Sequence, residues 1–436
     1  MWADTYKEAE RYILELPKVT AKNSLEDTRL FLKALGSPEE GKKIIHVAGT
    51  NGKGSVCAYL CSILKKGGYR TGLFTSPHLV EIRERFRIDG IPVTEERFLW
   101  GFRYVMERLG KMREASGKPE YHPTFFELLF LMGIVIFREE KTDFLILETG
   151  MGGRLDATNA VKSPVLTVIT SIGLDHMEYL GHTVEEIAGE KAGILKPGVP
   201  VVFCGKRKNA AAVIEKRAQM LENRAVGVKE GDFFYSKLTN KSIDFSMHSR
   251  YYGYIRLKLA TGAIYQAENA AIAVRCMEQI PEGRYLTGSQ IREGLEEAFW
   301  EGRMEEILPG VYVDGAHNED GIRAFVRSVE ADGCMGSRYL LFSAVSDKDY
   351  RGMIDILKNS GLFQEAAVAG IHNIRGVEPE MLKQHFNGMK CAFAADAQQA
   401  LNDLLAKKKE EDFIYIAGSL YFAGEVKALV RRKSDD

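Results

Sequence analysis

The stretch KKIIHVAGTNGKGSV, residues 42–56, sets a short run of apolar residues directly before a loop rich in glycine. The residues after it repeat apolar side chains with helical spacing until Gly67-Gly68. We therefore predict a buried strand, a glycine loop and a helix in succession. A loop in this position exposes backbone N–H groups at the positive end of a helix, and that arrangement suits a polyphosphate.

The glycine loop departs from the common phosphate-binding motif G-x-x-x-x-G-K-[ST]. Gly54 separates Lys53 from Ser55, and Val47 stands where that motif has its first glycine. If the loop binds phosphates, Lys53 would pair with the outer ones, and the hydroxyl of Ser55 or Thr50 could reach a magnesium ion. The alternative is a flexible turn beside a surface lysine.

Strand-like runs alternate with helical patterns through the first half of the chain. They include YRTGLFTSP (69–77), KTDFLILETG (141–150), SPVLTVITSIG (163–173) and VPVVFCG (199–205). Alternation of this kind predicts a parallel, doubly wound sheet. Residues 225–265 are less regular, and we expect a small appended sheet there, with strands around IDFSM and YYGYIRLKL.

A second alternating unit begins near residue 304. Its strand-like runs are EEILPGVYVDGAHN, RYLLFSAVSDKD, EAAVAGIH, CAFAAD and DFIYIAGSLY. We place a boundary close to Trp300–Arg303 and predict two domains, residues 1–298 and residues 299–436. The predicted fold class is α/β, with a P-loop domain on a doubly wound, mainly parallel sheet followed by a smaller α/β domain.

The composition is that of a globular protein without a dominant electrostatic partner. Hydrophobic residues make up 45% of the 436 and charged residues 27%, and the net charge is −1, which argues against nucleic acid or an anionic membrane as a partner. Six cysteines without a CxxC pair indicate reduced thiols. The N-terminus does not resemble a signal peptide. The apolar run LLFLMGIVIF (128–137) is too short to span a bilayer. We therefore expect a cytoplasmic protein in which that run is a buried helix.

Polar clusters follow the predicted strands of the first domain. They are Gly49–Ser55, Thr75–His78, Glu148–Asn159 and Asp175-His176. In doubly wound sheets ligands bind outside the carboxyl ends of the strands. We therefore expect the clusters to form one site.

Several members of this site have two interpretations. Glu148 could hold magnesium beside a phosphate loop, or it is a solvated glutamate at a strand end. His176 would be an unusual magnesium ligand, because magnesium prefers oxygen, and a lone histidine is more often structural. Lys191 either forms an ion pair with Glu190, or it is neutral enough in a small apolar pocket to form a carbamate with carbon dioxide. The loop DGAHN (314–318) either contacts a second substrate or makes a turn and caps the following helix.

Together these residues resemble the folylpolyglutamate synthase and dihydrofolate synthase family, a branch of the Mur ligase superfamily. The matching pieces occur in family order from residue 46 to residue 425: HVAGTNGKGS, TSPHL, FFELL, LETGMGGRLDATN, SIGLDHMEYLG, IAGEKAGILK, ENAAIAV, EGRMEE, DGAHN, DKD and GSLYFAGE. Gly54 looks like this branch's extra loop glycine. The resemblance implies an ATP-binding N-terminal domain and a smaller, Rossmann-like C-terminal domain, with the active site between them.

The resemblance also implies roles for individual residues. Catalytic roles fall to Lys53, Glu148, His176 and Lys191. Magnesium (Mg2+) would be held by Ser76, Glu148, His176 and a carbamylated Lys191, and a monovalent cation is allowed. ATP would contact Gly49, Thr50, Asn51, Gly52, Lys53, Gly54, Ser55, Asn269, Arg303 and Asp314. The pterin acid and glutamate would contact Pro77, His78, Arg85, Asp156, His317 and Ser419.

The implied activity is an ATP-dependent ligation of L-glutamate to dihydropteroate and to reduced folate polyglutamates through an acyl phosphate, by a monomer. Two pieces depart from the family: Tyr265 stands where histidine is common, and the common WPGR is Trp300-Glu301-Gly302-Arg303. The alternatives are folylpolyglutamate synthase activity alone, another Mur-type amino-acid ligase, and a P-loop ATP-binding switch protein. A cell-wall ligase usually has a separate N-terminal nucleotide-sugar domain, for which a phosphate loop at residue 49 leaves no room.

Overall fold

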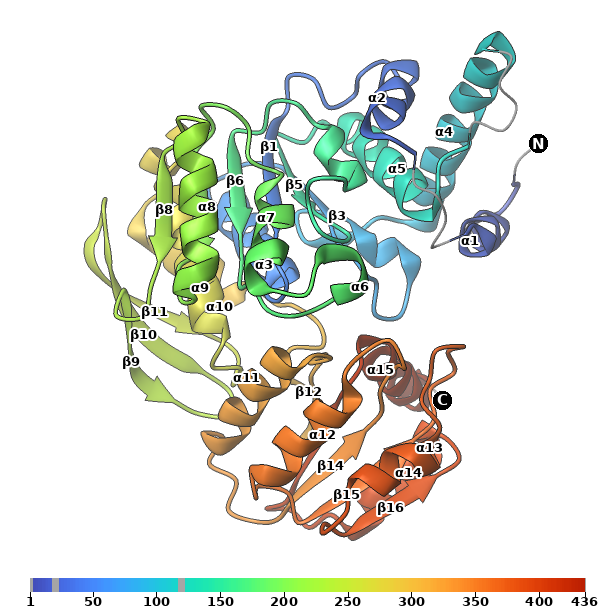
Figure 1. The fold of residues 1–436 in the computed structure, drawn as a ribbon, viewed down its shortest axis with the longest axis vertical. Coiled ribbons are helices and arrows are strands. Elements are labelled where there is room, and N and C mark those ends of the chain that lie inside the picture. The colour runs from blue at the N-terminus through green and yellow to red at the C-terminus, as the bar shows by residue number, and fades with distance from the viewer. Residues whose placement is uncertain (1–2, 18–22, 117–121, 436) are drawn as a thin grey trace.

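The computed structural model describes residues 3–17, 23–116 and 122–435, and it has two lobes, each built on its own large sheet (Figure 1). The first sheet has the strand order β4-β3-β2-β5-β1-β6-β7-β8. Neighbours from β2 to β8 are parallel, whereas β3 and β4 extend the sheet antiparallel. The strands are β1 (Lys43–Ala48), β2 (Thr71–Phe74), β3 (Phe86–Ile88), β4 (Ile91–Pro92), β5 (Phe144–Glu148), β6 (Leu166–Ile169), β7 (Val201–Cys204) and β8 (Ala225–Val228).

The central strand β1 is buried on both faces, which is why apolar residues dominate its sequence KIIHVA. Ile45 and Val47 belong to a core with one set of helices, and Ile44 belongs to a core with another set. The first set is α3 (Lys53–Lys66), α9 (Gln266–Met277) and α10 (Gly288–Glu297). The second set is α1 (Tyr6–Glu15), α2 (Leu25–Ala34), α4 (Glu95–Ser116) and α5 (Phe125–Glu139). A third core lies under α7 (Val184–Ala192) and α8 (Lys208–Met220).

Helix α3 is more buried than one apolar face would require. The sequence pattern favoured a single stripe that includes Val56 and Leu60, but Cys57, Ala58 and Cys61 are buried as well. The reason is that α3 packs against α9 and α10 as well as against the sheet. The apolar run 128–137 forms the middle of α5 and is buried, as predicted.

The described cysteines are all free thiols, which agrees with the prediction. Within residues 3–17, 23–116 and 122–435, no helix has the length and apolar character needed to cross a membrane.

The irregular segment after β8 forms a small antiparallel sheet, as predicted. Its order is β11-β10-β9, and its strands are β9 (Phe233–Leu238), β10 (Ile243–Ser249) and β11 (Gly253–Leu259). Alternate residues such as Phe245 and Leu257 are buried in the core that contains α9. The sheet is therefore packed onto the first domain by one of its faces.

The second lobe is a six-stranded sheet in the order β12-β13-β17-β14-β15-β16, parallel except for β12. Its strands are β12 (Glu305–Leu308), β13 (Val311–Val313), β14 (Arg338–Phe342), β15 (Glu365–Ala369), β16 (Cys391–Ala394) and β17 (Phe413–Ala417). Helices α11 (Glu319–Glu330), α12 (Tyr350–Asn359) and α13 (Pro379–His385) cover one face, and α14 (Ala397–Lys407) and α15 (Leu420–Asp435) the other. The predicted α/β fold class is confirmed. The domain ranges 1–298 and 299–436 stay a prediction.

Candidate active site

The phosphate loop lies between β1 and α3, at the carboxyl end of the central strand. Gly52 is the residue before α3 and has a left-handed φ of 87°. A Cβ at this position would lie 2.4 Å from Asn269 Oδ1 on α9. The loop therefore needs glycine there, both for its backbone angle and for the approach of α9.

The extra glycine has a steric role in the structure. A Cβ on Gly54 would lie 2.7 Å from Nε1 of Trp300 and 2.8 Å from two of its ring carbons. Trp300 belongs to the segment between the two lobes. Gly54 thus allows the indole of the linker to lie directly on the first turn of α3.

Lys53 is folded over its own loop. Its Nζ donates hydrogen bonds to the carbonyl oxygens of Gly49 (3.1 Å) and Thr50 (3.2 Å), and lies 4.0 Å from Oε1 of Glu148. The loop therefore carries a cation beside its backbone N–H groups and faces a carboxylate on the neighbouring strand. This is the charge arrangement needed for a polyphosphate with a divalent cation.

The two loop hydroxyls considered for magnesium are engaged in other contacts. Ser55 Oγ is buried and accepts a hydrogen bond from Gln266 Nε2 at 3.1 Å. Thr50 Oγ1 donates to the carbonyl of Gly173 at 3.1 Å. Ser76, at the end of β2, lines the same cavity as Glu148. Thr50 lines this cavity too, but its hydroxyl is engaged with Gly173, so Ser76 is the better placed of the predicted hydroxyl ligands.

Glu148 ends β5 and is buried, so it is not a solvated strand-end glutamate. Its Oε2 accepts a hydrogen bond from the backbone N–H of Ser76 at 3.0 Å. Burial raises the pKa of this carboxyl, and the nearby charge of Lys53 opposes that rise. Because the protein's own groups do not fully offset the cost of burying this negative charge, the carboxylate is suited to face an additional cation.

Lys191 does not pair with Glu190, so the simple ion-pair interpretation is wrong. Glu190 instead pairs with Arg154 at 2.9 Å. Lys191 is buried on α7, and its Nζ donates to the carbonyl of Gly49 at 2.8 Å. Burial, helped by the charge of Lys53, lowers the pKa of this amine to about 7. Much of the amine is therefore unprotonated near neutral pH.

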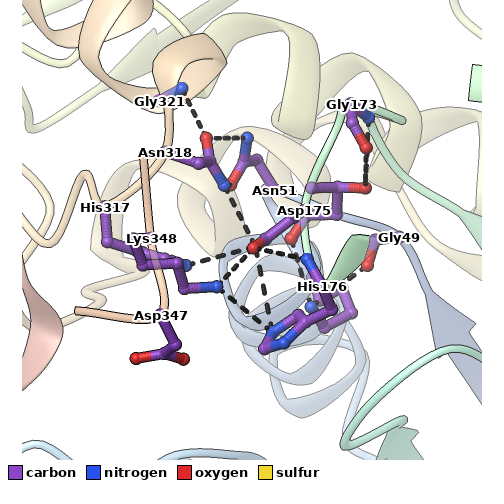
Figure 2. Close-up of polar contacts among 12 residues, drawn as sticks. Gly49, Asn51, Gly173, Asp175, His176, His317, Asn318, Gly321, Asp347 and Lys348 are labelled. Carbon is purple, nitrogen blue, oxygen red and sulfur yellow. Dashed lines mark hydrogen bonds and ion pairs between the residues drawn. The ribbon is translucent and has the colours of Figure 1, made fainter. Parts of the chain in front are cut away.

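Asp175 and His176 meet the second lobe (Figure 2). The carboxylate of Asp175 contacts the Lys348 ammonium, accepts from Asn318 Nδ2 at 3.2 Å, and lies 3.6 Å from His317 Nε2. Burial alone would raise the pKa of Asp175, but His317 and Lys348 hold it well below its ordinary value. Burial lowers the pKa of His176 to about 4, so its imidazole is neutral and able to donate a lone pair.

A pair of amides also joins the phosphate loop to the second lobe. Asn51 Nδ2 donates to Asn318 Oδ1 and Asn318 Nδ2 donates to Asn51 Oδ1, both at 3.1 Å (Figure 2). Asn318 Oδ1 also accepts from the N–H of Gly321 and so caps α11. Both interpretations of the DGAHN loop are therefore compatible, because its residues cap a helix and also line the site.

Two cavities adjoin at the linker. The first is lined by Gly49–Gly54, Ser76, Pro77, Glu148, Asp175, His176, Lys191, Trp300, Glu301, Arg303 and His317, among others. The second is lined by Ser55, Tyr59, Gln266, Phe299, Trp300, Arg303 and Tyr312, among others. Trp300 and Arg303 border both cavities. The strand-end clusters thus meet in one place, together with residues of the second lobe.

Two of the predicted ATP contacts serve as internal supports. Asn269 donates to Gln266 Oε1 at 2.9 Å and lies against Gly52. Asp314 is buried and accepts from Tyr265 OH at 2.5 Å and from the N–H of Met304 at 3.1 Å. Tyr265, the departure from the family pattern, therefore holds the linker through Asp314.

Four predicted substrate contacts are held by neighbouring groups. Arg85 Nε donates to His78 Nδ1 at 2.9 Å, and burial lowers the pKa of Arg85 to about 10. Asp156 lies outside the first cavity's lining and accepts four hydrogen bonds from its own loop, including the N–H groups of Gly150 and Met151.

Ser419 is also buried outside that lining, where its Oγ accepts from the N–H of Tyr421 at 3.2 Å. Lys348 was not among the predicted site residues, although it lies in the DKD motif after β14, one of the pieces that match the family.

Comparisons with known proteins agree on a family. Residues 109–277 match the model of the Mur ligase middle domain, and residues 302–420 match the Mur ligase, glutamate ligase domain. The dihydrofolate synthase/folylpolyglutamate synthase of Bacillus subtilis is 33% identical over 97% of this chain and 98% of its own length. The folylpolyglutamate synthase of Lacticaseibacillus casei is 30% identical over 97% and 98%. The structure of E. coli FolC in complex with DHPP and ADP has a TM-score of 0.85 at 29% identity, covering 100% of this chain and 99% of that one.

Proposed function

Because the chain belongs to the dihydrofolate synthase/folylpolyglutamate synthase family of Mur ligases, we propose that it is an ATP-dependent ligase that adds L-glutamate to dihydropteroate and to tetrahydrofolate polyglutamates. The observation that carries the proposal is the cavity in which the phosphate loop, Glu148 and Ser76 of the first domain face Asp175 and His317 at the domain interface. Lys348 of the second domain contacts the carboxylate of Asp175. A ligase of this kind must bring a phosphate donor, an acid and an amine together between two domains.

The first chemical step activates a carboxylate. An oxygen of the pterin acid's carboxylate attacks the γ-phosphorus of ATP, and the bond from that phosphorus to the β–γ bridging oxygen breaks. The products are an acyl phosphate and ADP. The N–H groups at the start of α3 hold the phosphates at the positive end of the helix. Lys53 leaves its loop carbonyls to neutralise charge on the transferring group.

The second step forms the amide. The unprotonated amine of glutamate attacks the acyl carbon, phosphate leaves, and the nitrogen loses a proton. Lys348 and His317 project from the second domain beside Asp175 and are well placed to attract the carboxylates of the incoming amino acid. Closure of the domains around this cavity excludes water, which would otherwise hydrolyse the acyl phosphate.

The residues around Glu148 fit a magnesium ion. A buried carboxylate and the Ser76 hydroxyl offer the oxygen donors that magnesium prefers, and neutral His176 adds a third donor. Within the described part of the chain, no three acidic, histidine or cysteine side chains form a metal cluster. This fits an ion that keeps water and phosphate ligands. When bound, magnesium would neutralise charge on the phosphate oxygens.

A carbamate on Lys191 would complete the oxygen donors. The amine is buried behind the phosphate loop and hydrogen-bonded to Gly49. Its nitrogen can bond to the carbon of carbon dioxide and release one proton, which converts a buried amine into an anion. High-resolution density at Lys191 tests this modification directly. A bare amine at physiological bicarbonate concentrations would refute it.

The second cavity is suited to the nucleoside of ATP, because it starts at the phosphate loop and continues between Tyr59, Gln266 and Trp300. Arg303, which borders both cavities, would contact the nucleotide, while Asn269 and Asp314 act by holding the loop and the linker. The loop of residues 75–90 would hold the pterin acid, with Pro77 and Arg87 lining the first cavity.

The deciding experiment offers dihydropteroate and tetrahydrofolate separately, each with ATP and labelled glutamate. We expect labelled product from both acceptors, and phosphate release that requires the acceptor and glutamate together. Product from tetrahydrofolate alone would restrict the protein to folylpolyglutamate synthase activity. Equal ATP hydrolysis with and without the other substrates would support a switch protein and refute the ligase. Light scattering tests the expected monomer.

A further inference from the structure

The linker between α10 and β12 carries a glutamate that contacts both domains. Glu301 Oε1 lies 3.4 Å from Arg87 Nη2 on β3 of the first domain. Its Oε2 lies 2.7 Å from Lys427 Nζ and 3.3 Å from Arg431 Nη2, both on α15 of the second domain. We call these four residues the Glu301 cluster.

The Glu301 cluster is largely withdrawn from solvent at its centre. The side chain of Glu301 is 17% exposed, and that of Lys427 is 6% exposed. Removing such charges from water costs about as much as their attraction returns, so a buried ion pair adds little net stability. What the cluster supplies is geometry, since the pairs form only when the linker, β3 and α15 have this relative placement.

Arg87 connects the cluster to the loop of residues 75–90. Its Nε donates to the carbonyl of Glu84 at 3.1 Å, and its guanidinium lies 5.3 Å from the ring centroid of Trp300. Arg87 and Glu301 both line the first cavity. The cluster is therefore part of the wall of the proposed reaction site as well as part of the domain interface.

Backbone packing supports the same junction from another side. A Cβ on Gly424 of α15 would lie only 2.0 Å from the carbonyl oxygen of Leu79. Helix α15 therefore lies directly against the loop of residues 75–90. Because α15 contacts both this loop and Glu301, a change in its position would alter the cavity.

We propose that Glu301 is a positioning residue that fixes the angle between the two domains in the arrangement that closes the reaction cavity. The proposal rests on the ligase function above and adds to it the group that holds the domains together around the substrates. Glu301 acts through Arg87, Lys427 and Arg431 and has no chemical step of its own.

The test compares Glu301→Gln with a matched control, Glu365→Gln. Glu365 is also a buried glutamate between two lysines, Lys390 at 2.7 Å and Lys407 at 2.6 Å, but all three lie within the second domain. Both variants remove one negative charge without changing side-chain size much. Only the first one breaks a contact between domains.

For Glu301→Gln we expect kcat/KM for the pterin acid to fall by at least about fivefold, the lower end of typical coupling between sites. Most of the loss should appear in KM, because a smaller fraction of the protein is in the binding-competent arrangement. Hydrogen–deuterium exchange should rise in residues 79–90 and 420–431 together. Glu365→Gln should leave the kinetics and these two segments unchanged.

The proposal is overturned if Glu301→Gln matches Glu365→Gln in kinetics and exchange, or if its activity falls only as far as its folded fraction in thermal melts. Arg87→Gln approaches the same contact from the first domain and should give the same exchange pattern. In the double variant the two effects should not add, and additive losses would also overturn the proposal. Failure of the ligase function would appear instead in the wild-type protein, as absence of product.

Discussion

The glycine that distinguishes the phosphate loop provides the sharpest test of the site. Gly54 lies in the first turn of α3 without a left-handed backbone angle, so alanine meets no backbone strain there. The added methyl group would lie 2.7 to 2.8 Å from three atoms of the Trp300 indole. Since non-bonded carbon atoms prefer separations of about 3.5–4.0 Å, the indole must move.

The size of the effect follows from two opposing contributions. Overpacking of this kind costs about 1–3 kcal/mol. Replacing glycine with alanine inside a helix contributes up to about 1 kcal/mol in the other direction. The free energy of unfolding should therefore fall by no more than about 3 kcal/mol. The displaced indole borders both cavities, so we expect the KM for ATP to rise by about tenfold, which corresponds to about 1.4 kcal/mol.

The assay measures ADP release against ATP concentration, with thermal unfolding in parallel. Gly110→Ala is the matched control, because Gly110 lies in α4 and a Cβ there meets nothing within 4 Å. It should raise stability slightly and leave KM unchanged. Adding Trp300→Leu to Gly54→Ala should remove the clash. In the Trp300→Leu background, the Gly54→Ala change should therefore raise the KM for ATP less than it does in the wild-type protein. A normal KM for ATP in Gly54→Ala would refute the steric role of Gly54.

Three further predictions concern the lysines of the site. Lys53→Ala should reduce kcat by about a hundredfold or more while the melting temperature stays close to that of wild type; near-normal turnover would contradict its phosphate role. Lys191→Ala should lose activity, and short carboxylic acids should restore part of it if a carbamate acts there; rescue by chloride at equal ionic strength would contradict this. In CO2-free buffer, the free energy of unfolding should rise with pH between about 7 and 10.5, which are the lowered pKa of Lys191 in the folded chain and its ordinary value. In this range the unfolded chain holds a proton on Lys191 that the native chain lacks. Below that window both states are protonated and the contribution is flat, so Lys191→Met should remove the slope, as urea titrations at several pH values would show.

The elements around the central sheet could be predicted because their patterns are local. One stretch of fewer than 25 residues contains the apolar run of β1, the glycines after it and the helical spacing of α3. Strand ends rich in polar residues then predicted where the site would form, since parallel strands share one carboxyl edge. The gathering of Lys53, Glu148 and His176 in one cavity agrees with that expectation.

Contacts between distant segments could not be predicted in this way. Asp175 and Lys348 are 173 residues apart, and nothing in either local pattern indicates the other. Ser55 directly follows the loop, yet its hydroxyl is taken by Gln266 from 211 residues away. Lys191 follows Glu190 in the chain, but on a helix adjacent residues point in different directions, so sequence proximity was misleading.

The reciprocal amide pair between Asn51 and Asn318 bears on the order in which substrates add. One amide belongs to the loop proposed to bind the nucleotide, and the other caps the helix after the loop proposed to face glutamate. A nucleotide that shifts Asn51 must therefore change the free energy of Asn318 in its present position. An amino acid that shifts Asn318 must likewise change the free energy of Asn51 in its position. Thermodynamic linkage then requires one factor in both directions: ADP must change the affinity for glutamate by the same ratio as glutamate changes the affinity for ADP.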